Sequence, residues 1–238
     1  MLENYTVIDL EMTGLNAKHH KILEVAAVRV RNKKITADIS KLIYQELPLE
    51  SEIVELTGIT DAMLEGAERE DNVLEEFFAF LGEDILVGHN VIFDYGFLKQ
   101  AAVNRKIPFE RKAADTLKIA RRCLPAEQKK DLESLCILKN VPMENHHRAL
   151  DDVKATQILY EILETEYEKK EPDIFCPKPL IYKVKKQTPA TQRQKKHLKE
   201  LMEYHKIDLN LPWDTLTRNE ASRQVDKIIS QYGRMPKN

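Results

Sequence analysis

Apolar and polar positions repeat along the chain with two different periods, which predict strands first and helices later. Apolar, β-branched runs at residues 5–10, 22–30 and 35–44 predict three consecutive strands. A short buried strand is predicted at 85–87. Helical spacing predicts helices at 51–64, 72–81, 94–104, 115–123, 131–139 and 149–169. Strands followed by alternating strands and helices predict an α/β domain with a mixed sheet flanked by helices.

The last quarter of the chain has a different pattern. Four prolines fall in residues 170–189, with Lys-rich sequence between them, which indicates a linker or an extended strap. Apolar spacing in residues 190–238 then predicts a small helical domain. Thr217 with Glu220 three residues later predicts a capping box at the start of its second helix. We therefore expect one domain over 1–169, a linker over 170–189 and a small basic helical domain over 190–238.

Composition narrows the class of protein. The chain has 238 residues, of which 42% are hydrophobic and 32% charged, as expected for a globular chain in water. No apolar run approaches the length of a membrane span, and the N-terminus lacks the pattern of a signal peptide. The three dispersed cysteines indicate reduced thiols. We therefore expect a cytoplasmic protein without a membrane partner.

Charge is distributed unevenly, although the net charge is only −2. Residues 178–238 hold 14 Lys and Arg against 6 Asp and Glu, so the remainder of the chain is acidic. A basic module can bind phosphates, and an acidic pocket can bind divalent cations. Solvated helix faces rich in lysine are an equally good explanation of the basic segment alone.

Two carboxylates lie at the end of the first predicted strand. Residues two apart on a strand face the same side, so Asp9 and Glu11 can meet at one point while Ile8 and Leu10 face the core. Two close carboxylates repel each other, and a bound divalent cation removes that repulsion. The alternative is an exposed strand end with no chemistry.

Further acids open two later helices. Asp94 follows the strand at 85–87, where a helix N-cap is the alternative role. Asp151 and Asp152 begin the long helix after His147, and helical periodicity allows either one to point inward. A cap and a solvated acid are again the alternatives, but all these features together in this order are much harder to explain structurally.

Together the motifs resemble the DnaQ-like (DEDDh) 3′→5′ exonuclease family of ribonuclease H-like fold. Residues 9–15 match its first motif, residues 89–94 match its His-Asn-x-x-Phe-Asp motif, and His147 with Asp152 match its last motif. The resemblance selects Asp152 over Asp151. It covers about residues 5–168, and the chain is similar to the proofreading exonucleases of bacterial DNA polymerase III.

The resemblance implies a mechanism and a set of site residues. Asp9, Glu11, Asp94 and Asp152 would hold two Mg²⁺ or Mn²⁺ ions, with Asp9 bridging them and Asp94 acting through the second ion or its waters. His147 would accept the proton of the attacking water. The product would be nucleoside 5′-monophosphates. Substrate contacts are expected from Leu10, Met12, Thr13, Gly14, Leu15, Thr57, His89, Asn90 and Phe93.

The expected partner is nucleic acid with a free 3′ end, with single-stranded DNA favoured over RNA. A polymerase or another replication or repair protein is a further expected partner. Two alternatives stay open: an exoribonuclease that trims RNA, and a non-catalytic nucleic-acid-binding or polymerase accessory subunit. The C-terminal segment is similar to small modules appended to bacterial and phage nucleic-acid proteins, and its basic charge favours a grip on nucleic acid.

Overall fold

A six-stranded sheet forms the centre of the protein. The computed structural model describes residues 2–143, 148–184, 188–209 and 211–236. In that part of the chain the strand order is β3-β2-β1-β4-β5-β6. The strands are β1 (Tyr5–Met12), β2 (Ile22–Arg31), β3 (Lys34–Leu42), β4 (Leu86–Gly88), β5 (Lys112–Asp115) and β6 (Lys178–Pro179). The first three are antiparallel, β4 and β5 run parallel to β1, and β6 is antiparallel to β5. The predicted mixed sheet is confirmed.

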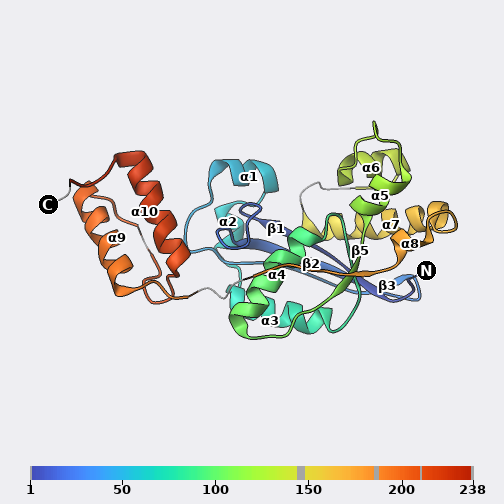
Figure 1. The fold of residues 1–238 in the computed structure, drawn as a ribbon, viewed down its shortest axis with the longest axis horizontal. Helices are drawn as coiled ribbons and strands as arrows, with labels where there is room; N and C mark the ends of the chain where they lie inside the picture. Colours follow the sequence, from blue (N-terminus) through green and yellow to red (C-terminus); the bar gives the residue numbers. More distant parts are fainter. Residues whose placement is uncertain (1, 144–147, 185–187, 210, 237–238) are drawn as a thin grey trace.

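Helices cover both faces of this sheet (Figure 1). The helices of the described residues are α1 (Ser51–Thr57), α2 (Asp61–Leu64), α3 (Glu70–Leu81), α4 (Ile92–Arg105), α5 (Thr116–Cys123), α6 (Leu132–Lys139), α7 (Ala149–Tyr167), α8 (Pro172–Phe175), α9 (Gln192–His205) and α10 (Arg218–Tyr232), of which α9 and α10 lie apart from the sheet. Helices α3 and α4 share one apolar cluster with the sheet, and α5, α6 and α7 share the other. The sheet is therefore enclosed between two helical layers.

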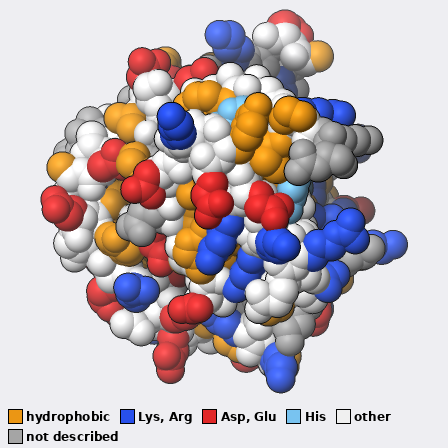
Figure 2. Space-filling model, turned by 90° about the vertical axis from the view of Figure 1, so that its left-hand side faces the viewer, with side chains coloured by type: hydrophobic (Ala, Val, Ile, Leu, Met, Phe, Trp, Pro, Cys, Tyr) orange, Lys and Arg blue, Asp and Glu red, His pale blue; other side chains and the backbone are white. Residues whose placement is uncertain are grey.

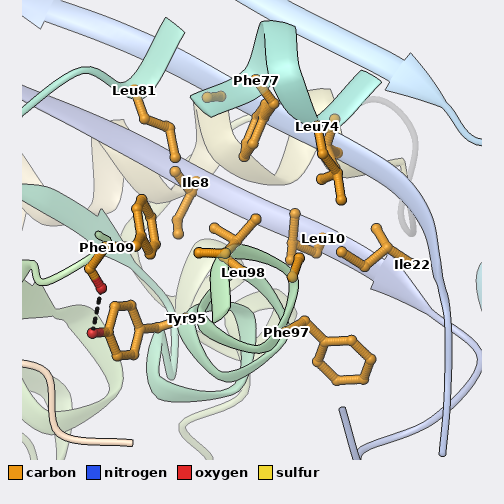
Figure 3. Packing of buried hydrophobic residues seen from close by; sticks show 14 of the residues in the cluster. Ile8, Leu10, Ile22, Leu74, Phe77, Leu81, Tyr95, Phe97, Leu98 and Phe109 are labelled. Carbon is orange, nitrogen blue, oxygen red and sulfur yellow. Dashed lines mark hydrogen bonds between the residues drawn. The ribbon is translucent and has the colours of Figure 1, made fainter. Parts of the chain in front are cut away.

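Alternation along β1 divides its side chains between the two layers. Ile8 and Leu10 join the cluster formed with α3 and α4, where Figure 3 shows them beside Leu98. Tyr5 and Val7 face the opposite layer, which contains α7. Asp9 and Glu11, two and four residues after Val7, therefore lie on the α7 side of the sheet.

The structure differs from the predicted elements in three places. The helix predicted at 51–64 is wrong as a single element, because Gly58 adopts a left-handed conformation (φ 67°) that ends α1, and α2 follows separately. Strand β5 was not predicted because its apolar run contains only Ala113 and Ala114. The segment predicted as a linker or strap contains α8, and its strand β6 pairs with β5 at the sheet edge.

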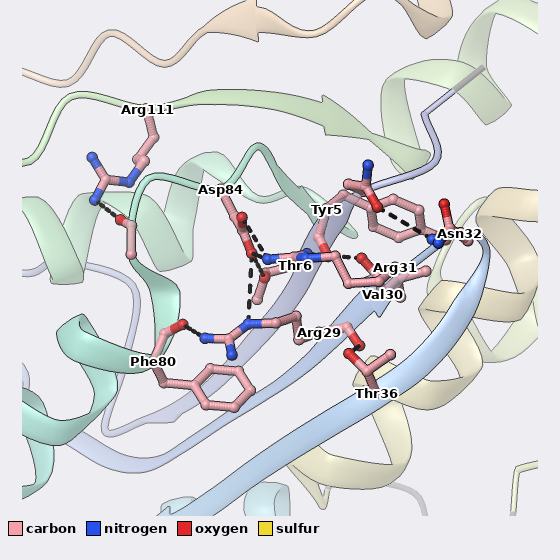
Figure 4. A network of polar contacts seen from close by, with 12 residues as sticks. Tyr5, Thr6, Arg29, Val30, Arg31, Asn32, Thr36, Phe80, Asp84 and Arg111 are labelled. Atoms are coloured by element: carbon pink, nitrogen blue, oxygen red, sulfur yellow. Dashed lines mark hydrogen bonds and ion pairs between the residues drawn. The ribbon is translucent and has the colours of Figure 1, made fainter.

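An ion-paired network fixes the start of β1 against its neighbours (Figure 4). The carboxylate of Asp84 accepts hydrogen bonds from Arg31 Nη2 at 2.6 and 2.8 Å and from Thr6 Oγ1 at 2.6 Å. Asp84 lies two residues before β4, whereas Thr6 and Arg31 belong to β1 and β2. This contact helps to set the parallel register of Thr6 with Leu86, so the carboxyl ends of β1 and β4 lie side by side.

The C-terminal module (residues 188–236) has its own apolar cluster between α9 and α10, with Leu47 packed against it. The predicted capping box of Thr217 and Glu220 is confirmed. Ion pairs join α10 to the rest of the chain, Lys21 to Glu220 at 2.6 Å and Lys227 to Glu50 at 2.9 Å. Figure 2 views this end of the molecule, where Lys and Arg gather toward the right.

Two simpler expectations can be compared with the structure directly. All three cysteines carry free thiols. Within the described ranges, none of the helices is both long and apolar enough to cross a membrane.

Candidate active site

Three carboxylates meet where the end of β1 faces the start of α7. Asp9 and Glu11 come from β1, and Asp152 comes from the first turn of α7. One oxygen of each lies within 4.8 Å of the other two. Asp152 is 8% exposed, whereas Asp151 is more exposed and is absent from this trio. The structure therefore places Asp152, the aspartate selected by the motif, beside the two carboxylates of β1.

Asp94 approaches the same strand from the other helical layer. It lies in the first turn of α4 and is 5% exposed. Its Oδ1 accepts a hydrogen bond from the backbone N of Leu10 at 3.0 Å. The alternative that Asp94 is a helix N-cap is wrong, because Val91 occupies that position. Asp94 instead bonds to the residue between the two strand carboxylates.

Burial and mutual repulsion shift the pKa values of these acids upward. Burial raises the pKa of Asp9 well above its usual value, and the charges of Asp94, Asp152 and Glu11 raise it further. Burial and Asp152 raise the pKa of Glu11 to about 8. Burial raises the pKa of Asp94 to about 7, against the opposing effect of its backbone hydrogen bonds. Such a cluster favours a compensating positive charge at its centre.

The donor set fits a hard divalent cation. The trio offers only carboxylate oxygens, which Mg²⁺ and Mn²⁺ prefer. Burial, with the neighbouring carboxylates, raises the pKa values of Asp9 and Glu11, so a bound cation would stabilise their charged forms. His147, expected as the general base, lies outside the described residues.

The loop after β1 carries the residues expected to contact the terminal nucleotide. Thr13 closes this loop, because its N donates to Lys21 O and its Oγ1 accepts from Lys21 N, both at 2.9 Å. Gly14 has φ 147°, and a Cβ there would come within 2.7 Å of the His20 ring. Leu15 is 71% exposed beyond it. The loop is therefore tied at its neck and presents an apolar side chain at its tip.

Met12 is partly buried against the α3–α4 cluster, and Leu10 is buried within it. Only the backbone of Leu10 is left for a substrate contact, and the expected contact of Leu10 stays a prediction. Thr57 is also buried, and its hydroxyl donates to Ile53 O and accepts from Ile59 N. The expected contact of Thr57 with a nucleotide stays a prediction.

Residues of the second motif lie between β4 and α4. His89 Nδ1 lies 2.9 Å from Thr116 Oγ1, and burial lowers the pKa of His89. Asn90 has a positive φ of 63°, and its backbone N donates to Asp115 Oδ1 at 3.0 Å. Phe93 leaves 38% of its surface exposed at the start of α4. Backbone shape thus explains Asn90, whereas the role of Phe93 as a substrate contact stays a prediction.

Two residues beside the carboxylates were missed by the motif analysis. Glu24 is fully buried on β2, directly opposite Glu11 in the antiparallel ladder. Arg148 Nη2 lies 3.3 Å from Glu24 Oε1. The signal available in the sequence was an acidic residue, Glu24, inside the apolar run at 22–30. Nearby, Asp115 caps α5, because its carboxylate accepts hydrogen bonds from Leu117 N and Lys118 N.

Comparison with known proteins identifies the family of the chain. The model of the exonuclease family of RNase T type matches residues 6–160. DNA polymerase III of PolC type is 40% identical over 157 residues in Halalkalibacterium halodurans and 38% over 160 residues in Bacillus subtilis. These matches cover 64% and 66% of this chain, but the chain spans only about 11% of the length of either relative.

Solved structures support the ribonuclease H-like exonuclease fold. Exonuclease X in complex with 5′ overhanging duplex DNA is 25% identical, with a TM-score of 0.56 over 72% of this chain and 97% of that one. The nuclease domain of 3′hExo, a DEDDh family member bound to rAMP, is 20% identical, with a TM-score of 0.59 over 69% and 93%. The latter is evidence for the fold alone.

Proposed function

Because the chain belongs to this exonuclease family, we propose that it is a metal-dependent 3′→5′ exonuclease that releases nucleoside 5′-monophosphates. The observation that carries the proposal is the trio of Asp9, Glu11 and Asp152, with oxygens within 4.8 Å of one another. A trio assembled from a strand end and a distant helix makes no evident contribution to the stability of the fold. Its mutual repulsion would instead destabilise the metal-free protein.

Two divalent ions, Mg²⁺ or Mn²⁺, would be held by this trio together with Asp94. When bound, such ions neutralise phosphate charge, activate water and stabilise the leaving oxygen of a phosphodiester. The four carboxylates would hold the two positive ions in place. The bond from Leu10 N keeps the Asp94 carboxylate fixed beside β1, so this acid needs little rearrangement on binding.

The protein's own side chains would supply substrate position and proton transfer. Leu15 is exposed at the tip of the tied loop, and Phe93 is partly exposed at the start of α4. Both would pack against the bases of the terminal nucleotides, and Gly14 would let the backbone approach the sugar. His147 would accept a proton from the attacking water, since an imidazole titrates near neutral pH.

Single-stranded DNA is the substrate that we propose first. The relatives at 36–40% identity are DNA polymerases, and exonuclease X was solved with duplex DNA. A paired 3′ end must be unstacked before it can enter a closed site, which favours single strands. The same relatives suggest a polymerase or another replication or repair protein as partner, and a cytoplasmic location.

A paired digestion tests this proposal. Single-stranded DNA and RNA of one sequence, labelled at the 5′ end, are incubated with the full chain and Mn²⁺, with EDTA as a control. We expect a ladder that shortens from the 3′ end, faster on DNA, and no cleavage in EDTA. Faster digestion of RNA would make the protein an exoribonuclease. Cleavage of neither would favour a binding or accessory subunit.

A matched pair of variants tests the site. Asp9→Ala removes the strand carboxylate and should abolish the ladder while the protein stays folded. Asp151→Ala removes an acid from the same turn of α7 as Asp152, but one outside the trio, and should keep activity. Loss of activity in both variants, or in neither, would contradict the assignment of the metal-binding acids.

A further inference from the structure

Glu24 is a charged residue in a position where apolar residues are expected. It lies within β2, fully buried. Its Oε1 accepts hydrogen bonds from Ser40 Oγ at 3.0 Å and from Arg148 Nη2 at 3.3 Å. Its Oε2 is enclosed and has no partner among the described residues. A buried carboxylate with one unsatisfied oxygen is costly, so its presence calls for a function.

The register of the sheet places Glu24 beside the acidic trio. Glu24 and Glu11 are directly opposite each other on neighbouring antiparallel strands. Side chains at opposite positions share a face of the sheet, with Cβ atoms about 5 Å apart. Glu24 therefore lies on the α7 side of the sheet, next to a residue of the trio.

Arg148 connects Glu24 to the helix that carries the third acid. It is the residue that precedes α7, and its backbone O accepts from Asp151 N at 2.9 Å and from Asp152 N at 3.1 Å. Its guanidinium meanwhile bonds to Glu24. The contact thus continues from β2 through the Arg148 side chain and backbone to the first turn of α7.

Electrostatic repulsion explains why such a connection would be needed. Asp152 on α7 faces Asp9 and Glu11 on β1, and like charges at this separation push the helix start away from the strand. The Glu24–Arg148 contact joins the start of α7 to β2, which pairs with β1 in the sheet, and therefore opposes that movement. The positive charge of Arg148 also lowers the pKa of Glu11, opposing the raising effect of the nearby acids.

We propose that Glu24 and Arg148 are a positioning pair that holds Asp152 at ion-binding distance from Asp9 and Glu11. The inference rests on the proposed function of the trio as a metal site. The pair acts through geometry, because Arg148 fixes the first turn of α7 and Glu24 fixes Arg148. Neither side chain needs to touch the substrate.

Metal binding to the full chain tests the pair without reference to activity. Mn²⁺ alone is titrated calorimetrically into the wild type, Glu24→Gln, Arg148→Met and the double variant. We expect each single variant to bind Mn²⁺ about 10-fold more weakly, which is the usual effect of residues that support metal ligands. The double variant should bind no more weakly than either single variant, because both changes break one connection.

Charge alone predicts a different pattern. Removing the negative Glu24 would weaken Mn²⁺ binding, whereas removing the positive Arg148 would strengthen it. Tighter binding by Arg148→Met, or unchanged binding by Glu24→Gln, would therefore overturn the inference. Arg148 has a side chain that is 43% exposed, so its variant is expected to fold and provides the test even if Glu24→Gln does not.

Two controls complete the design. Glu76→Gln removes another glutamate that is ion-paired across the structure, to Lys41, but exposed and outside the trio, and it should bind Mn²⁺ like the wild type. Excess Mn²⁺ should restore most of the activity of Glu24→Gln, since the chemistry is intact once the ions are bound. A wild type that neither binds Mn²⁺ nor cleaves DNA would refute the proposed function itself. A wild type that does both, beside variants with unchanged affinity, would refute only the positioning pair.

Discussion

Replacing Asp9 by Asn should make the metal-free protein more stable while removing its response to metal. Asp9 has two like-charged neighbours, Glu11 and Asp152, with oxygens within 4.8 Å. Two unit charges at that distance repel by about 3.5 kcal/mol at an effective dielectric constant of about 20. The metal-free wild type relieves much of this repulsion by retaining protons. We therefore expect a net gain of about 2 kcal/mol in the variant at pH 9.

The pH dependence of this gain follows from the direction of the pKa shifts. The pKa of Glu11 is raised from 4.5 to about 8 in the folded protein, mainly by burial. Between these values the unfolded chain has lost a proton that the folded chain retains. The free energy of unfolding of the metal-free wild type should therefore fall as pH rises from about 4.5 to 8. Removing the charge of Asp9 weakens one of the repulsions, so the variant should fall less steeply.

Urea denaturation in EDTA and in Mn²⁺ measures both effects. At a Mn²⁺ concentration about 100 times the dissociation constant, the wild type should gain about 2.7 kcal/mol, and Asp9→Asn should gain far less. The reasoning would be refuted by a variant less stable than the wild type in EDTA at pH 9. It would equally be refuted by equal stabilisation of both proteins by Mn²⁺.

Three further predictions concern the substrate. Deleting residues 188–238 should weaken binding of single-stranded DNA, because contacts between basic side chains and phosphates are lost. The slope of log affinity against log salt concentration should fall in magnitude by at least about 1. An unchanged slope in filter binding would exclude a nucleic-acid-binding role for this segment. Gly14→Ala should raise KM more than it lowers kcat in steady-state digestion. The added Cβ would meet the His20 ring at 2.7 Å and strain the loop. An unchanged KM would show that this loop does not contact the substrate. Phe93→Ala should raise KM about 10-fold with little loss of stability, because stacking on one base contributes roughly 1–3 kcal/mol. A melting curve measured beside the kinetics would separate the effect on substrate binding from the effect on stability.

Strong local periodicity explains why much of the fold could be predicted. Side chains of β1 alternate between two apolar layers, and α7 has an unbroken helical pattern of apolar positions. The sequence of each therefore predicts its secondary structure without reference to distant residues. Strands β5 and β6 contain four and two residues, and their pairing depends on partners distant in the chain. Nothing in such short segments distinguishes a strand from a loop.

The family motifs predicted more of the site residues than strand alternation and helical periodicity did. Alternation alone places Asp9 and Glu11 on one face, and the structure agrees. Helical periodicity could not choose between Asp151 and Asp152, because the choice depends on how α7 packs against β1. Glu24 was missed since its meaning lies in its cross-strand neighbour, which appears only once the register is known.

The contacts around the carboxylates indicate how the fold sustains an arrangement that repels itself. The Asp84 network secures the start of β1, and the bond from Leu10 N secures Asp94 beside its end. The Arg148–Glu24 pair joins the start of α7 to β2. These contacts reach the sheet from three segments, the residues before β4, the start of α4 and the start of α7. These contacts prevent the acids from moving apart in spite of their mutual repulsion. The carboxylate oxygens are therefore already close together when a cation binds.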